Sequence, residues 1–153
     1  MQMLPLEDTA WAPLPGENAE SRISVGPYHA TVPGLALRKA FQLEARDPIS
    51  GYLFFTDDDC PFEERLSITL TDQTLTILDR VSFGAPYRSA NLQDSVVAGP
   101  GAVDVTIHPN ERWRLTVLPR AEWRLPIPSH DGWRWRGFSA RRHLRLDRLT
   151  PAN

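Results

Sequence analysis

The chain has 153 residues, 41% of them hydrophobic, and this length and composition fit one globular domain with a core of its own. It has no apolar run near the roughly 18 residues of a membrane span, no basic and apolar secretory signal at its start, and a single cysteine, which excludes an internal disulfide, so we expect a cytoplasmic protein without a membrane partner. The net charge of −2 divides unevenly, because residues 1–110 hold 15 acidic and 7 basic side chains whereas residues 111–153 hold 4 acidic and 10 basic ones.

Residues 1–21 combine several prolines with acidic side chains, a composition that cannot sustain a helix or a central strand. We predict an extended, Pro-rich N-terminal arm there, followed by a single all-β domain over residues 22–153. At the start of this domain, apolar residues alternate on both sides of Gly26-Pro27. That pattern indicates two short strands within residues 22–32.

Residues 35–45 are ambiguous, because they consist of good helix formers but place Leu35, Leu37, Phe41 and Leu43 at alternate positions. A helix would move Leu35 and Leu43 partly away from the shared face, so we favour a strand that Lys39 alone interrupts. A turn and a short buried strand over residues 52–55 follow.

The clearest hairpin lies between residues 66 and 83. Apolar residues occupy even positions from Leu66 to Leu70 and odd positions after Asp72-Gln73, as antiparallel pairing across a short turn requires. The pattern predicts that Leu70 lies opposite Leu75 and that Ile68 lies opposite Ile77.

One carboxylate interrupts the odd-numbered face of this hairpin, because Asp79 lies between Ile77 and Val81. Either a bulge or strand end rotates it outward, or it is buried and needs hydrogen-bond donors. We favour the outward position, since an unpaired buried carboxylate is costly. Residues 84–101, with their prolines and small residues, are predicted to be a long irregular connection.

A second hairpin is predicted from residues 103–107 and 113–117, with Ile107 opposite Trp113 and Val105 opposite Leu115. The fragment Trp113-Arg-Leu recurs ten residues later at Trp123, and we expect both indoles on the core face. Pro126 and Pro128 indicate an edge strand, residues 130–132 a turn, and residues 142–149 a final strand on which Leu144 and Leu146 face together.

Eight to ten short strands with turn signals at this spacing predict an all-β fold. We favour an antiparallel β-sandwich over a small closed β-barrel, because proline-rich connections suit strands that pass from one sheet to another.

No nucleotide-binding loop, serine-nucleophile motif or paired-histidine spacing occurs in the sequence, and the four histidines are far apart. We therefore expect neither a metal site nor a cofactor. The densest charge is an acidic run that contains Asp57, Asp58, Asp59, Glu63 and Glu64. It offers oxygen ligands for calcium or magnesium but lacks the spacing of an EF-hand loop, so we interpret it as a solvated loop that could attract a basic protein partner.

Arginine and tryptophan interleave over residues 112–136, a composition that superficially suits nucleic acid. If the tryptophans face the core, however, strand alternation alone places the arginines on the solvent-exposed face. A nucleic-acid partner is then disfavoured. The short segment with Trp133, Arg134, Trp135 and Arg136 follows a turn and is flanked by glycines. We expect its two indoles to be the more exposed ones and the four residues to be the candidate ligand-binding set.

Three functional hypotheses follow, in order of preference. The first is a noncatalytic interaction protein that docks a protein partner through the acidic run or the long connection, for example a bacterial immunity protein that neutralises a toxin. The second is a protein that binds a small molecule or sugar in a tryptophan-lined cleft. The third is an enzyme that uses carboxylates such as Asp79 and Glu64. Small all-β domains support all three, so the fold does not decide among them.

Overall fold

The computed structural model describes residues 1–3, 9–60, 65–84, 90–107, 111–125, 133–135 and 140–149. Within these residues the chain forms strands and no helix, as predicted, and none of them belongs to a helix that could cross a membrane. The strands are β1 (Gln2–Met3), β2 (Ala10–Pro13), β3 (Glu20–Val25), β4 (Tyr28–Pro33), β5 (Ala36–Leu43), β6 (Gly51–Asp57), β7 (Leu66–Asp72), β8 (Ile77–Phe83), β9 (Leu92–Gly99), β10 (Ala102–Ile107), β11 (Glu111–Trp123), β12 (Trp133–Trp135) and β13 (Arg141–Leu149).

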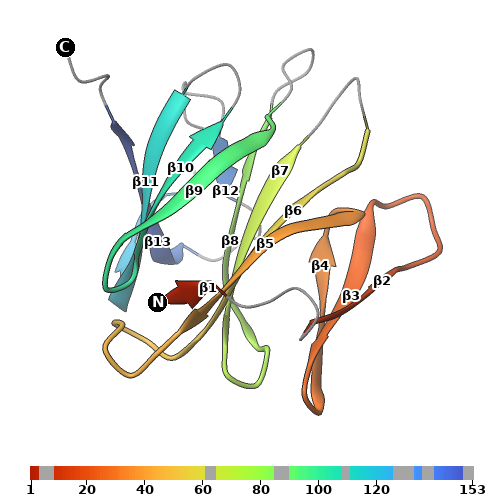
Figure 1. Ribbon diagram of the computed structural model, residues 1–153, viewed down its shortest axis with the longest axis horizontal. Helices are drawn as coiled ribbons and strands as arrows, with labels where there is room; N and C mark the ends of the chain where they lie inside the picture. The colour runs from red at the N-terminus through yellow and green to blue at the C-terminus, as the bar shows by residue number, and fades with distance from the viewer. Residues whose placement is uncertain are drawn as a thin grey trace.

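The strands form three antiparallel sheets. A central sheet has the order β1-β5-β6-β7-β8-β12, a second sheet the order β13-β11-β10-β9, and a third sheet the order β2-β3-β4. Figure 1 shows the central sheet between the other two. The sheets stay separate and do not close into one barrel, so the fold agrees with the predicted sandwich.

The predicted N-terminal arm is not confirmed. In the described part of residues 1–21, β1 pairs with β5 at the edge of the central sheet, and β2 pairs with β3 in the third sheet. Backbone pairing, which the prolines made us discount, therefore ties this segment to the body of the protein.

Two hydrophobic clusters lie on opposite faces of the central sheet. The large core lies between the central and second sheets and includes Phe55, Ile68, Phe83 and Trp113, and the smaller one includes Ile23, Val32, Phe54 and Leu75. Strand β7 is buried on both of its faces for this reason. Its leucines and Ile68 belong to the large core, while the alternate residues Ser67, Thr69 and Thr71 project from the opposite face.

The predicted register of the first hairpin is wrong. Leu70 lies opposite Asp79, and Ile68 lies opposite Val81, so the connection is longer than we expected. The Asp72 carboxylate stabilises this longer loop by accepting hydrogen bonds from the backbone N–H of Thr74 (2.8 Å) and of Thr76 (2.9 Å) and from the Thr74 hydroxyl (2.8 Å). Partial burial alone would raise the pKa of Asp72, but these hydrogen bonds lower it below its ordinary value.

The longer loop allows the side chain of Leu75 to pack in the smaller core. Its φ of 61° is left-handed, a conformation that costs a branched residue energy, and the side chain is almost fully buried beside Ile23 and Phe54. The residue that we predicted to pair with Leu70 therefore packs on the other face of the central sheet.

The second hairpin is also shifted, by two residues. Val105 lies opposite Trp113, and Val103 lies opposite Leu115. Because successive side chains point to opposite faces, an even shift leaves the predicted core face intact, and both valines, Trp113 and Leu115 are buried.

The prediction that Trp123 belongs to the core is wrong. Strand β11 pairs Val117 with Leu144 and then Glu122 with Arg142, so five steps along β11 match only two along β13. The three additional residues of this bulge reverse which face each later residue of β11 occupies. Trp113 is 2% exposed and Trp123 is 75% exposed as a result, although they stand ten residues apart in what looks like one alternation.

The other predicted elements divide into confirmed and incorrect ones. Within residues 35–45 the chain does form a strand, β5, but the predicted shared face is wrong, because the register shifts between Leu37 and Lys39: Leu37 packs against the smaller cluster while Phe41 and Leu43 belong to the large core, and Leu35 is exposed. The two short strands within 22–32, the strand over 52–55 and the final strand with buried Leu144 and Leu146 are confirmed. The irregular connection over 84–101 is wrong in part, because β9 lies within it and pairs with β10. The edge strand predicted near Pro126 and the turn over 130–132 lie outside the described residues.

Candidate functional site

A charged cleft of about 500 Å³ opens where the third sheet meets the central sheet. Its described lining comes from five separate stretches of the chain: the β2–β3 connection with the first residue of β3, the end of β4, the residue after β6, the residue before β7, and the middle of β8. The lining residues are Glu17, Asn18, Ala19, Glu20, Pro33, Asp58, Arg65 and Arg80.

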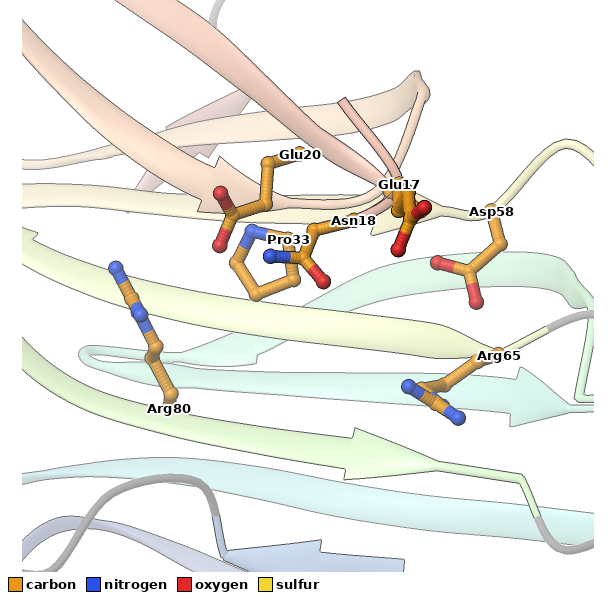
Figure 2. A pocket seen from close by; sticks show the side chains of 8 residues that line it. Glu17, Asn18, Glu20, Pro33, Asp58, Arg65 and Arg80 are labelled. Atoms are coloured by element: carbon orange, nitrogen blue, oxygen red, sulfur yellow. The ribbon is translucent and has the colours of Figure 1, made fainter. Parts of the chain in front are cut away.

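The charges of the cleft are separated by side. Figure 2 shows the carboxylates of Glu17, Glu20 and Asp58 along one side and the guanidinium groups of Arg65 and Arg80 along the other. The acidic side thus combines one residue of the predicted acidic run with two residues of the β2–β3 segment. A ligand that fits both sides carries cationic and anionic groups on different parts of its surface.

Arg80 connects the central sheet to the third sheet. It lies opposite Thr69 on the face of β8 that points away from the large core, and its Nη2 donates a hydrogen bond to the carbonyl oxygen of Thr31 on β4 (2.8 Å). Burial lowers the pKa of Arg80, and the nearby Glu20 carboxylate acts in the opposite direction. One end of the guanidinium is thus fixed by β4, which holds the side chain at the cleft.

Hydrogen bonds across the junction hold the acidic side in place. The Thr56 hydroxyl donates to the Pro33 carbonyl (2.5 Å), the Ser21 hydroxyl donates to the Gly34 carbonyl (2.8 Å), and the Gly34 N–H donates to the Ala19 carbonyl (2.6 Å). These bonds join β3, β4 and β6 directly beside Glu20 and Asp58. The backbone that carries Glu20 and Asp58 is therefore fixed before a partner binds, which lowers the entropy cost of binding.

The structure divides the predicted acidic run. Asp57 is buried and pairs with Arg38, whose Nε donates to Oδ2 and whose Nη2 donates to Oδ1 (3.1 Å), and Asp59 also pairs with Arg38 (3.2 Å). Our interpretation of the run as solvated is therefore wrong for Asp57, because Arg38 of β5 provides its counter-charge. Asp58 lines the charged cleft.

Glu63 and Glu64 lie outside the described residues, and the partner-binding role of the run stays a prediction. Among the described residues, no group of three or more histidine, cysteine, aspartate or glutamate side chains could hold a metal ion.

Trp133, one of the two candidate ligand-binding tryptophans, is not among the residues that line the charged cleft. Trp133 lies opposite Phe83 at the edge of the central sheet and packs, partly buried, against the large core. Arg134 is exposed, whereas the side chain of Trp135 and all of Arg136 lie outside the described part of the chain. A ligand-binding role for these residues also stays a prediction.

Asp79, the candidate catalytic carboxylate, lies between the central and second sheets. The outward position that we favoured is wrong, because Asp79 is 4% exposed and accepts hydrogen bonds from the backbone N–H groups of Arg80 (2.8 Å), His143 (2.8 Å) and Leu144 (3.0 Å) and from Arg142 Nη1 (3.2 Å). Burial raises the pKa of Asp79, against the effect of these four donors. Its proposed partner Glu64 lies outside the described residues, and Asp79 does not line the charged cleft.

Comparison with known proteins found no matching family model, no matching curated protein and no matching solved structure. The function of this chain is therefore inferred from the arrangement of its own side chains.

Sequence reasoning missed four of the charged residues that line the cleft: Glu17, Glu20, Arg65 and Arg80. The residues next to each of them in the sequence form no motif that distinguishes it from an ordinary polar residue of a loop or strand. The only signal was the alternation in β8, which places Arg80 on the face opposite Val81, and alternation cannot show that Glu20 lies across from a residue 60 positions later.

Proposed function

We propose that this chain is a noncatalytic binding protein that docks a protein partner in the charged cleft. The partner's bound segment presents basic side chains to Glu17, Glu20 and Asp58 and an acidic group to Arg65 at the exposed end of the other side. The observation that carries the proposal is the division of the cleft into an acidic and a basic side, which gives a partner both an orientation and a register.

The polarity of the cleft favours a protein segment over a small apolar or sugar ligand. Pockets for small molecules are mostly apolar with a few polar groups, whereas five of the eight described residues that line this cleft are glutamate, aspartate or arginine. A volume of about 500 Å³ accommodates a few side chains of an extended segment. The partner therefore inserts a short charged stretch, and its remaining contacts lie on the surface around the cleft.

The residue types of the cleft favour binding over covalent catalysis. Glutamate, asparagine, alanine, proline, aspartate and arginine make up its described lining, with no serine, cysteine, histidine or lysine to serve as an activated nucleophile. The carboxylates face guanidinium groups, an arrangement that suits recognition of charge.

The test compares proteins captured from the native source by the wild-type chain and by a variant that carries Glu17→Lys and Asp58→Lys. A matched control carries Glu44→Lys and Asp94→Lys, which reverse two exposed carboxylates outside the cleft. We expect a specific partner to be retained by the wild type and by the control and lost by the cleft variant. Retention of the same proteins by all three chains, each with an unchanged melting temperature, would refute the proposal.

A further inference from the structure

Strand β9 forms one edge of the second sheet, and in the described part of the chain only β10 pairs with it. An edge strand presents unpaired backbone N–H and C=O groups with which a strand of another chain can pair. The side chains of β9 leave this edge accessible, since Val96 is 58% exposed, Val97 is 40% exposed and Ala98 is exposed as well.

The two edges of the second sheet differ in charge. Strand β13, at the opposite edge, carries four arginines and one aspartate. Charged side chains on an edge strand are a common protection against pairing. In β9 the only charged residue is Asp94, so any such protection of this edge depends on that residue.

Hydrogen bonding inside the sheet shows which way the backbone groups of β10 point. The N–H of Val117 on β11 donates to the carbonyl oxygen of Gly101, just before β10 begins (2.7 Å). Pairing between β10 and β11 is regular from there on, and backbone groups alternate in direction along an antiparallel pair. Those of Val103 and Val105 therefore point to β11, and not to β9.

Two residues of β9 consequently direct their backbone groups to the free edge. Ser95 lies opposite Val105 and Val97 lies opposite Val103, so both residues point away from β10. A second observation agrees for Ser95, because its N–H donates to Oδ1 of the neighbouring Asp94 (2.7 Å) and not to β10. The Asp94 carboxylate thus occupies one of the donors of the free edge.

The free edge of β9 is complementary to itself. When two copies pair antiparallel with Val96 on the two-fold axis, Ser95 of each copy lies opposite Val97 of the other, and their outward backbone groups meet. The two exposed Val96 side chains then lie side by side on one face of the joined sheet. The two Asp94 carboxylates lie on opposite sides of the axis and do not face each other.

The length of the regular stretch favours a second copy over a longer strand of another protein. The register of β9 against β10 shifts on both sides of residues 94–97, so irregular backbone bounds this stretch at each end. A longer regular strand would meet these irregularities. A second copy presents the same short stretch and the same two outward residues.

We propose that the free edge of β9 is a self-association surface for β9 of a second copy, and that Asp94 keeps it closed. Pairing requires the N–H of Ser95 to leave the Asp94 carboxylate and to donate to the carbonyl oxygen of Val97 of the second copy. A hydrogen bond to a carboxylate is stronger than one to a carbonyl oxygen, so this exchange opposes association. The two-fold dimer contains the exchange twice.

The experiment measures self-association of the full chain by sedimentation equilibrium at concentrations up to about 1 mM. We expect Asp94→Thr to dimerise with a dissociation constant about tenfold or more below that of the wild type, because the N–H of Ser95 is then free in both copies. The matched control is Glu44→Thr, which removes an exposed carboxylate away from β9 and should behave as the wild type.

Two additional substitutions locate the dimer contact in the Asp94→Thr background. Val97→Pro removes an N–H that points to the free edge, so it breaks no bond to β10 but removes a bond of the dimer. Val96→Lys places two like charges side by side on the two-fold axis. Each should restore the monomer, and far-ultraviolet circular dichroism should show that each variant keeps its β-structure.

Equal association of Asp94→Thr and the wild type, whether both are monomers or both are dimers, would overturn the proposal. A dimer of Asp94→Thr that persists with Val96→Lys and with Val97→Pro would overturn it as well, because that dimer would use another surface. The charged cleft lies where the third sheet meets the central sheet, whereas β9 belongs to the second sheet, so none of these results bears on partner binding in the cleft.

Discussion

Trp113 and Trp123 offer a comparison of one residue type at two positions of the same strand. Trp113 is 2% exposed, lies in the large core, and contacts Phe83 edge to face with ring centroids 5.6 Å apart. Burying an indole removes about 200 Å² from water, which at about 25 cal/mol per Å² corresponds to about 5 kcal/mol as an upper value. We therefore expect Trp113→Ala to lower the free energy of unfolding by about 3 to 5 kcal/mol, since it also leaves a cavity.

Trp123→Ala should cost less than about 1 kcal/mol, because the residue is 75% exposed and loses mainly its contact with Arg141. The measurement is urea denaturation followed by far-ultraviolet circular dichroism, which does not depend on the indole that is removed. Equal m-values would show that the variants differ in stability alone.

Trp113→Phe separates ring packing from the indole N–H. Within the described residues the Trp113 Nε1 is buried without a hydrogen-bond partner, so phenylalanine removes an unsatisfied donor and keeps an aromatic ring. Its cost should be about 1 to 2 kcal/mol, well below that of alanine. A cost for Trp123→Ala that equals or exceeds the cost for Trp113→Ala would refute the assignment of faces in β11 and the bulge on which it depends.

Three further outcomes are expected. Asp79→Ala should lower the free energy of unfolding by about 3 kcal/mol or more in chemical denaturation, because the buried Arg142 guanidinium and two backbone N–H groups of β13 lose this acceptor; a loss under about 1 kcal/mol would contradict its buried role. Asp72 has a lowered pKa in the folded state, so it stabilises the protein above its unfolded pKa near 3.8, and this contribution is lost as pH falls through the lower folded value. The wild type should therefore be more stable than Asp72→Ala near neutral pH, and the difference between their free energies of unfolding should shrink in acid. Chemical denaturation of both chains at several pH values measures this difference. Gly51→Ala should destabilise β6 and β7 sharply, because a Cβ there would lie 2.0 Å from the Thr71 carbonyl oxygen, and an unchanged melting temperature would contradict this close approach.

Alternation predicted which residues face the core wherever a strand runs without interruption. Val103, Val105 and Trp113 are buried as expected, even though the register that joins their strands was wrong. The register depends on the loop, and in the first hairpin the loop is fixed by the side chain of Asp72 and by a left-handed Leu75. Neither feature follows from the pattern of apolar residues.

The charged cleft and the exposed position of Trp123 were harder to predict than the strands, for two physical reasons. The charged cleft depends on contacts between distant segments, such as the bond from Arg80 to the carbonyl oxygen of Thr31, and no local spacing encodes them. The exposure of Trp123 depends on a bulge between Val117 and Glu122, which reverses the two faces of the strand.

Asp79 shows where the sequence contained more information than the prediction used. The alternation placed this carboxylate on the core face of β8, and we rejected that position because a buried unpaired charge is costly. The same alternation places Arg142 on the core face of β13, in step with Leu144 and Leu146. Lys39 also interrupts an apolar face, so the sequence offered two cations of the required sign. Only the packing of the two sheets selects Arg142, whose Nη1 lies 3.2 Å from the Asp79 carboxylate. That choice also fixes the orientation of the paired ends of β11 and β13 that carry Trp123 and Arg141. A charge on a predicted core face is thus better treated as half of a pair whose partner lies on another strand's core face than as evidence against burial.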